Sequence, residues 1–171
     1  SKAGDFFKKA HKAVENTDRY VHTWDGELYM EGHRGTYTSQ GYNKKTNRHL
    51  ENKLAQIEWL SSLAYVLGGE YAQQTLHDCW ECVLLHQFHD IIPGSSIQEV
   101  YQDSRVNYAK AEADADEAKS IALQKLQVAA ADTYTVYSTN SYGGAELVQI
   151  PETRQGRFRN AAGEELPAQK T

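Results

Sequence analysis

The stretch LENKLAQIEWLSSLAYVLGG, residues 50–69, carries the apolar spacing that decides the fold. Its apolar residues recur at steps of three and four, at Leu50, Leu54, Ile57, Leu60, Ala64 and Leu67. This spacing predicts one face of an amphipathic helix, because an α-helix turns once in about 3.6 residues. Gly68 and Gly69 predict the end of the helix, since glycine takes the left-handed C-terminal cap without a steric penalty.

A second helix is predicted for residues 70–90. We expect four of its side chains to point toward the core: Leu76, Cys79, Val83 and Leu84. The helix should finish near Asp90, because Ile92 precedes Pro93 and the residue before a proline is disfavoured in the helical region. Pro93 and Gly94 then suit the two central positions of a type II turn.

A third helix is predicted from Ser96 to about residue 131. It begins with Ser-Ile-Gln-Glu (96–99), which matches the capping box in which serine and glutamate satisfy each other's backbone amides. KAEADADEAK (110–119) is interpreted as a solvated helix face. Because the alanine-rich second half has only a thin apolar face, we expect it to project or to lie on a neighbouring domain. Three helices with short connections predict an antiparallel bundle.

The segments on either side of the helices have a different composition. Residues 1–40 are rich in Gly, Tyr and His and show no sustained helical period beyond a short helix at Asp5–Val14. The chain after the third helix shows strand and hairpin signals. They lie in three stretches: DTYTVYSTN (132–140), GAELVQIP (144–151) and GRFRNAAGEELP (156–167). Two or three strands are too few for a stable sheet domain. The predicted fold is therefore mainly α: an antiparallel three-helix bundle at 41–132, flanked by loop and β segments from neighbouring domains.

Composition and charge exclude several classes of protein. Apolar residues make up 40% of the chain and charged residues 24%, as in ordinary soluble globular proteins, and the net charge is −5. A mildly acidic chain is a poor electrostatic partner for nucleic acid. No apolar run approaches the roughly 20 residues that span a bilayer, so no membrane partner is expected. Cys79 and Cys82 do not make a disulfide framework, and a bridge between them on one helix would be strained, which indicates a reducing compartment.

Four potential zinc ligands follow one another closely in the second helix: Cys79, Cys82, His86 and His89. On one straight helix the first and last of them lie roughly 15 Å apart along the axis. Zinc–ligand bonds are only about 2.0–2.3 Å long, so the four cannot close a tetrahedron. We therefore interpret the two cysteines as small buried core residues.

HQFHD, residues 86–90, places two histidines and a carboxylate at the predicted helix end. His86 with His89, or His86 with Asp90, would share a helical face and could offer one or two ligands to a metal completed from elsewhere. Alternatively, His89 lies there because a helix C-terminus favours an imidazolium. His86 is interpreted as a core histidine, or as one that contacts a metal ligand without binding the metal itself.

Arg34 lies between Gly32 and Gly35 in GHRGTYTSQ (32–40). It could bind an anion or a sugar hydroxyl, or it could tie its loop to its own domain. Tyr37 and Tyr42 are interpreted as core or interface residues, because tyrosine is common where domains pack.

The stretches HQFHDIIPGSS (86–96) and GELYMEGHRGTYTSQ (26–40) together resemble the α-mannosidases of glycoside hydrolase family 38. The first resembles that family's helical middle region, and the second the point where the catalytic domain passes into it. AELVQIP (145–151), followed by GEELPAQ (163–169), is similar to the start of the family's C-terminal β-sandwich domain. The resemblance thus implies that residues 1–40 end a catalytic domain and that 133–171 begin the β domain.

The same resemblance implies a zinc-dependent retaining α-mannosidase that hydrolyses terminal α-linked mannose in oligosaccharides or glycans. It assigns His89 as one ligand of a single zinc ion and Asp90 as a contact to sugar hydroxyls. The nucleophile, the general acid and the remaining ligands are expected outside residues 1–171, so no catalytic residue is assigned here. The isolated chain should be inactive, and residues 1–40 should be poorly packed.

A non-catalytic helical scaffold is the alternative from another class of protein, and it requires His89 to be buried. The resemblance to bacterial-type members and the two cysteines favour the cytoplasm. The oligomeric state stays open, with a homodimer as one alternative, as do the linkage specificity and the identity of the divalent metal.

Overall fold

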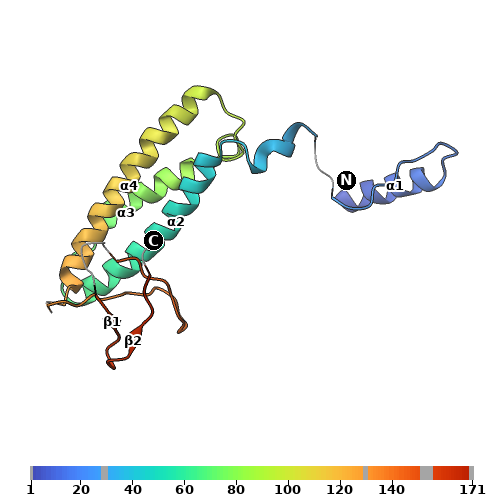
Figure 1. Ribbon diagram of the computed structural model, residues 1–171. Coiled ribbons are helices and arrows are strands. Elements are labelled where there is room, and N and C mark those ends of the chain that lie inside the picture. The colour runs from blue at the N-terminus through green and yellow to red at the C-terminus, as the bar shows by residue number, and fades with distance from the viewer. Residues whose placement is uncertain (1, 28–30, 129–130, 151–155, 170–171) are drawn as a thin grey trace.

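The structure, a computed structural model, describes residues 2–27, 31–128, 131–150 and 156–169. Its elements are α1 (Ala3–Glu15), the 3-10 helix η1 (Glu31–Tyr37), α2 (Gly41–Val66), α3 (Gln73–Leu85), α4 (Gln98–Leu126), β1 (Phe158–Arg159) and β2 (Glu165–Leu166). Figure 1 shows α2, α3 and α4 side by side, with successive helices running in opposite directions. The predicted mainly α architecture with a three-helix bundle is therefore confirmed.

The core of the bundle lies where α2, α3 and α4 meet. It is formed by buried side chains from all three helices: Leu50, Leu54, Ile57, Leu76, Cys79, Val83, Tyr108, Ala111, Ala115 and Ala118. A second cluster joins the far ends of α2 and α4 through Leu60, Ala64, Ala122 and Leu126. The predicted apolar face of residues 50–64 is thus confirmed.

Two leucines that the sequence placed toward the core are exposed instead. Leu67 is 57% exposed because it follows the last residue of α2, and Leu84 is 60% exposed. Val83 occupies the core-facing position of α3, so the next residue is rotated about 100° away from it. The end of α2 is as predicted: Gly68 has a φ of 80°, and the amides of Gly68 and Gly69 bond back to Tyr65 O and Ala64 O.

The alanine-rich half of α4 does not project from the bundle, contrary to the sequence-based expectation. Ala111, Ala115, Ala118 and Ala122 are buried, and α4 packs along α2 and α3. Small side chains let helix backbones approach closely, so a thin apolar face suffices for tight packing. The interpretation of residues 110–119 as a solvated face holds only for the side turned away from this seam.

Replacing Ala115 with leucine should destabilise the bundle, because the added atoms have no space at the α2–α4 seam. The expected loss in free energy of unfolding is about 1–3 kcal/mol, the usual cost of overpacking. Ala113→Leu is the matched control on the same helix, since Ala113 is exposed. Urea unfolding followed by circular dichroism measures both variants. Equal midpoints for the two would contradict the packing described here.

A charged cluster joins α2 and α4 beside this seam. Lys53, whose side chain is 12% exposed, pairs with Glu112 and with Asp116 Oδ1 at 2.8 Å, and His49 Nε2 lies 3.2 Å from Glu112 Oε1. Burial alone would raise the pKa of Glu112, but its hydrogen bonds to Lys53 and His49 and their charges outweigh burial and hold this pKa below its usual value. The folded chain therefore favours the Glu112 carboxylate.

Glu112→Gln should consequently lower stability at neutral pH and have little effect in acid. Because the pKa of Glu112 is lowered by folding, its contribution is full above the unfolded-chain value of about 4.5 and is lost as the pH falls through the folded value. Unfolding midpoints from pH 7 to pH 3 measure the difference from the unmodified chain. Glu117→Gln, at an exposed position of α4, is the control. A difference that persisted undiminished in acid would contradict the ion-pair account.

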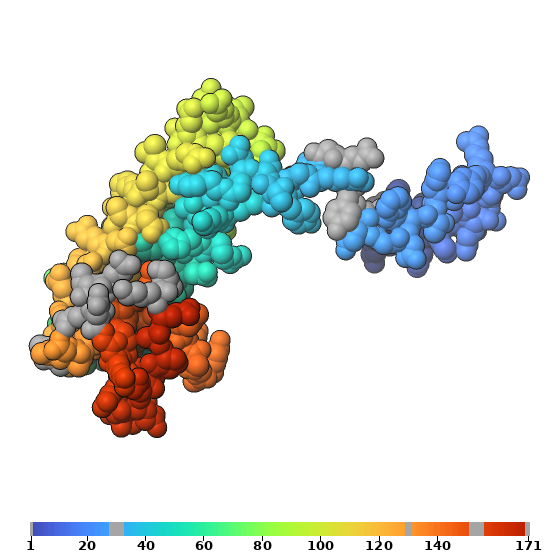
Figure 2. Space-filling view, viewed as in Figure 1, coloured from blue at the N-terminus to red at the C-terminus, as the bar shows by residue number. Residues whose placement is uncertain are grey.

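The flanking segments have little structure of their own. α1 has no buried residue and lies away from the bundle, so the expectation of a poorly packed N-terminal segment is confirmed for its described part (Figures 1 and 2). The predicted short helix at Asp5–Val14 is α1. At the other end, Figure 2 shows the C-terminal residues gathered beside the end of α4, where Tyr137 Oη donates to Leu126 O at 2.6 Å.

The β signals are only partly realised. β1 and β2 form an antiparallel pair with Phe158 opposite Leu166, as predicted for the hairpin at 156–167. The strands expected at 132–140 and 144–151 are wrong for the described residues up to 150, which form no strand; residue 151 lies outside the described part. A strand needs a neighbouring strand for its ladder of backbone hydrogen bonds, and among the described residues only β1 and β2 are paired in this way. The boundaries 1–40, 41–132 and 133–171 stay predictions.

Among the described residues, no helix has the length and apolar character needed to cross a bilayer.

Candidate functional site

Helix α3 ends at Leu85, five residues before the predicted end, and this places His89 in a turn. The helix can stop there because each of its last four carbonyl groups finds a donor. Cys82 O accepts from His86 N at 3.2 Å, Leu84 O from Gln87 N, and Leu85 O from Phe88 N. Val83 O accepts from Asn47 Nδ2 at 3.0 Å. His86 and His89 therefore do not share a helical face, which corrects the geometry expected from their spacing.

His86 is a core residue, as one of the two interpretations held. It is 2% exposed, its Nδ1 lies 2.7 Å from Cys82 O, and its ring centre is 4.5 Å from that of Tyr108. The short contact to a carbonyl assigns the Nδ1 proton as the donor. This side chain thus locks the end of α3 to its own preceding turn and to α4.

Asn47 on α2 is a buried polar group that the sequence pattern did not single out. Its Nδ2 donates to Val83 O and to Tyr108 Oη at 3.1 Å, and its Oδ1 accepts from Gln87 Nε2 at 3.0 Å. Burial raises the pKa of Tyr108 to about 12, although the Asn47 hydrogen bond acts in the opposite direction. A signal was present: Asn47 precedes Leu50 by three residues and so continues the apolar face of α2.

His89 and Asp90 project into solvent from the turn. Their side chains are 80% and 59% exposed, and His89 Nε2 lies 3.7 Å from Asp90 Oδ2, too far for a hydrogen bond. The ring of Phe88 lies 4.2 Å from that of His89. The scaffold alternative required a buried His89, and the structure contradicts that requirement. Among the described residues, neither side chain has a hydrogen-bond partner, so both offer lone pairs to a ligand.

The chain cannot build a complete metal site from its described residues. Among them, no group of three or more His, Cys, Asp and Glu side chains is placed to hold a metal ion. Cys79 is buried, as predicted, and burial raises its pKa to about 11, while burial also raises the pKa of the half-buried Cys82. Both thiols are free of disulfides. Thiols that stay protonated are poor metal ligands, so within the 79–90 stretch neither cysteine competes with His89 and Asp90 as a donor.

The backbone of the turn is fixed from the α4 side. Ser96 Oγ donates to Asp90 O at 2.6 Å, and the Ser96 amide donates to Tyr101 Oη at 2.9 Å. Helix α4 accordingly begins at Gln98 without a side-chain cap, so the predicted capping box is wrong. The serine hydroxyl is used to hold the carbonyl of Asp90 instead.

Gly94 brings the same turn against the segment that precedes α2. Its φ of 92° fits the third position of the predicted type II turn. A Cβ at Gly94 would lie 2.8 Å from Ser39 Cβ, so only glycine allows this approach. Lys44 Nζ reaches the carbonyls of both segments, Ser39 O at 2.5 Å and Ile92 O at 2.7 Å.

Gly94→Ala should loosen this end of the bundle, because it adds a positive-φ penalty and a clash with Ser39. We expect a loss of about 1–2 kcal/mol in unfolding free energy from the backbone conformation alone. Gly35→Ala is the control, since a Cβ at Gly35 would meet no heavy atom within 4 Å and Gly35 has no positive φ. Denaturant titration of both variants measures the difference, and similar losses for the two would rule out the contact.

Arg34 and the two tyrosines are distributed differently from the expectation. Arg34 is exposed in η1 and forms no ion pair among the described residues, so both of its interpretations, an anion or sugar contact and a tie to its own domain, stay predictions. Tyr37 is 75% exposed, which rules out a place in the core of this bundle and leaves the interface alternative as a prediction. Tyr42 does pack between helices: the Arg105 guanidinium lies 4.2 Å above its ring, and the ring of Tyr108 is 6.4 Å away.

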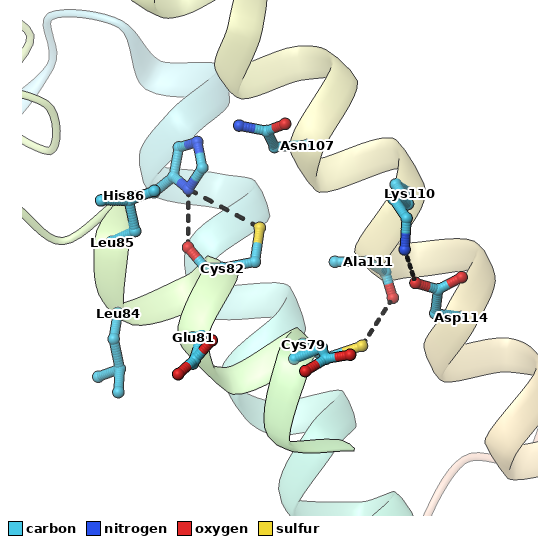
Figure 3. A pocket seen from close by; sticks show the side chains of 11 residues that line it. Cys79, Glu81, Cys82, Leu84, Leu85, His86, Asn107, Lys110, Ala111 and Asp114 are labelled. Atoms are coloured by element: carbon cyan, nitrogen blue, oxygen red, sulfur yellow. Dashed lines mark hydrogen bonds and ion pairs between the residues drawn. The ribbon is translucent and has the colours of Figure 1, made fainter. Parts of the chain in front are cut away.

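A groove of about 580 Å³ runs between α3 and α4, but it is separate from the exposed pair. Figure 3 shows His86, Cys82 and Asn107 at one end of it, and the Lys110–Asp114 ion pair further along. Neither His89 nor Asp90 lines this groove. The cavity therefore does not contain the residues with the free ligand atoms.

The comparisons with known proteins concern this same bundle. The family model for the alpha-mannosidase middle domain matches residues 31–126. The alpha-mannosidase of Saccharomyces cerevisiae is 49% identical over 83 residues, covering 47% of this chain and 8% of the relative. Human alpha-mannosidase 2C1 is 39% identical over 103 residues, and alpha-mannosidase G of Dictyostelium discoideum is 43% identical over 103 residues. These alignments cover 59% and 60% of this chain.

The chain spans only about a tenth of the length of these relatives, which are covered to 10% and 9% in the human and Dictyostelium alignments. The matched range contains η1 and all three helices of the bundle, together with the turn that presents His89 and Asp90. With more than half of its residues matched, the chain belongs to the alpha-mannosidase middle-domain family.

Proposed function

We propose that this chain is the helical middle part of a zinc-dependent, retaining α-mannosidase that hydrolyses terminal α-linked mannose in oligosaccharides or glycans. The family match over residues 31–126 supports the mannosidase assignment. The observation that carries the site assignment is the exposed His89–Asp90 pair, whose ligand atoms are free in an otherwise well-satisfied turn. In this proposal the bundle forms one wall of an active site that is completed by residues outside the chain.

The donor atoms at this wall fit a zinc site that is shared with another domain. Imidazole nitrogen and carboxylate oxygen are both common zinc ligands, and a catalytic zinc needs three protein ligands and an open position. His89 would supply one ligand, and the other ligands would come from outside the chain. A zinc ion bound there would polarise the sugar hydroxyls that approach its open position.

Asp90 would bind the sugar directly. Its carboxylate is an acceptor that can take hydrogen bonds from two neighbouring hydroxyls, and mannose presents its 2- and 3-hydroxyls as a cis pair. The retaining mechanism requires two further carboxyl groups about 5 Å apart, one as nucleophile and one as acid/base. Neither is assigned to a residue of this chain, so this proposal limits His89 and Asp90 to holding and orienting.

His89→Ala should abolish zinc retention and lower the turnover of an aryl α-mannoside by the full-length enzyme on the order of 100-fold or more, since loss of even a supporting partner of a metal ligand typically costs about 10–100-fold. Asp90→Asn should leave zinc bound and weaken sugar binding. His77→Ala is the control, because His77 is also an exposed histidine but lies in α3, away from the turn. Metal analysis and steady-state kinetics measure these effects, and normal zinc content in His89→Ala would refute the ligand role.

The cytoplasm is the proposed compartment, supported by the two free thiols. Fractionation of cells that express the tagged enzyme tests this directly.

A further inference from the structure

We infer that Lys44 is a positioning residue that holds the His89–Asp90 turn in register with the segment preceding α2. Its ammonium group is hydrogen-bonded to Ser39 O and to Ile92 O at 2.7 Å. Ser39 lies two residues after the end of η1 at Tyr37, and Ile92 lies two residues after Asp90. One side chain from the first turn of α2 thus joins the two stretches that lie at the same end of the bundle (Figure 1).

The need for such a contact follows from how weakly the functional side chains are held. His89 and Asp90 are mostly exposed and are not hydrogen-bonded to each other. Their positions are therefore set by the backbone of residues 88–92, where the amides of Ile91 and Ile92 both donate to Phe88 O at 2.8 and 3.0 Å. Any movement of that backbone moves both side chains together.

The backbone of the turn is held on two sides by different means. On the α4 side, Ser96 Oγ bonds to Asp90 O and Tyr101 Oη lies 3.4 Å from Ile91 O. On the α2 side, Lys44 supplies the hydrogen bond across the gap, and the close contact of Gly94 with Ser39 sets the spacing. Without Lys44, Ile92 O would lose its hydrogen bond from α2, while the van der Waals contact of Gly94 with Ser39 would remain.

The chemistry of Lys44 fits this task. Both partners are neutral carbonyls, and no carboxylate competes for the ammonium group within the described chain. Lys44 is half-buried, and burial lowers its pKa. Charge-assisted hydrogen bonds are stronger than neutral ones, which favours an ammonium over an amide or hydroxyl for spanning two backbone segments.

The first test uses the 171-residue chain and measures hydrogen exchange at the amides of Ile91, Ile92 and Gly94. Lys44→Met keeps the unbranched shape of the side chain, one atom shorter, but has no donor. Exchange should therefore speed up roughly tenfold, as expected for a locally opened segment, while core amides of α2 and α4 are unchanged. Lys45→Met is the matched control, because Lys45 is the exposed neighbour. Equal exchange in the two methionine variants would overturn the inference.

The second test uses the full-length enzyme and rests on the proposed function. Lys44→Met should lower kcat more than it raises KM for an aryl α-mannoside, roughly tenfold or more, since a small misplacement of a binding group costs rate. Lys44→Arg, which keeps a cationic donor, should recover most of the loss in both tests. The inference holds that Lys44 acts through its cationic hydrogen-bond donor and not through the shape of its side chain. An arginine variant as defective as Lys44→Met would therefore also overturn it.

The two proposals fail separately. If His89→Ala kept its zinc while Lys44→Met still accelerated exchange in the turn, the metal-ligand role would be refuted and the anchoring role would stand. If His89→Ala lost zinc but Lys44→Met changed neither exchange nor kcat, the anchoring role would be refuted and the ligand role would stand.

Discussion

The buried side chain of Asn47 is the constraint on which the geometry of the site depends. It joins α2 to α3 and α4 through Val83 O and Tyr108 Oη, partners that are 36 and 61 residues away in the chain. A buried amide costs free energy unless its donors and acceptor are satisfied, so these bonds admit few alternative arrangements of the three helices. They fix where α3 ends, and the end of α3 decides where His89 and Asp90 emerge.

Tight packing of α4 supports that arrangement. The row of buried alanines lets α4 lie close along α2, and Tyr108 is the large side chain that reaches the Asn47 group from that helix. If α4 were further from α2, Tyr108 could not bond to Asn47, and Tyr101 could not reach the turn with its hydroxyl. The buried alanines in the second half of α4 and the tyrosines in its first half therefore depend on the same close approach of α4 to α2.

The helices and the hairpin could be predicted because their signals are local. The spacing of Leu50, Leu54 and Ile57 and the Gly68–Gly69 cap each act within a few residues, as does the turn of the 156–167 hairpin. The errors have the opposite origin. Ser96 leaves the capping box because Asp90 O and Tyr101 Oη, brought close by folding, offer better partners. The early end of α3 similarly depends on an amide from α2, which no pattern within residues 70–90 reveals.

The sequence drew attention to the candidate residues but not to their geometry. The family resemblance of HQFHDIIPGSS pointed to His89 and Asp90, whose roles stay predictions, and a continuous helix would have placed them on the face shared with His86, which is buried. Ending the helix at Leu85 separates the three: His86 closes the core, and His89 and Asp90 turn outward. The side chains of Ser96, Tyr101 and Lys44 hold this turn through hydrogen bonds to its backbone carbonyl groups. Neither outward side chain is therefore used to stabilise it. A turn held in this way can present an imidazole and a carboxylate to solvent, because the free energy that orders the turn comes from other residues.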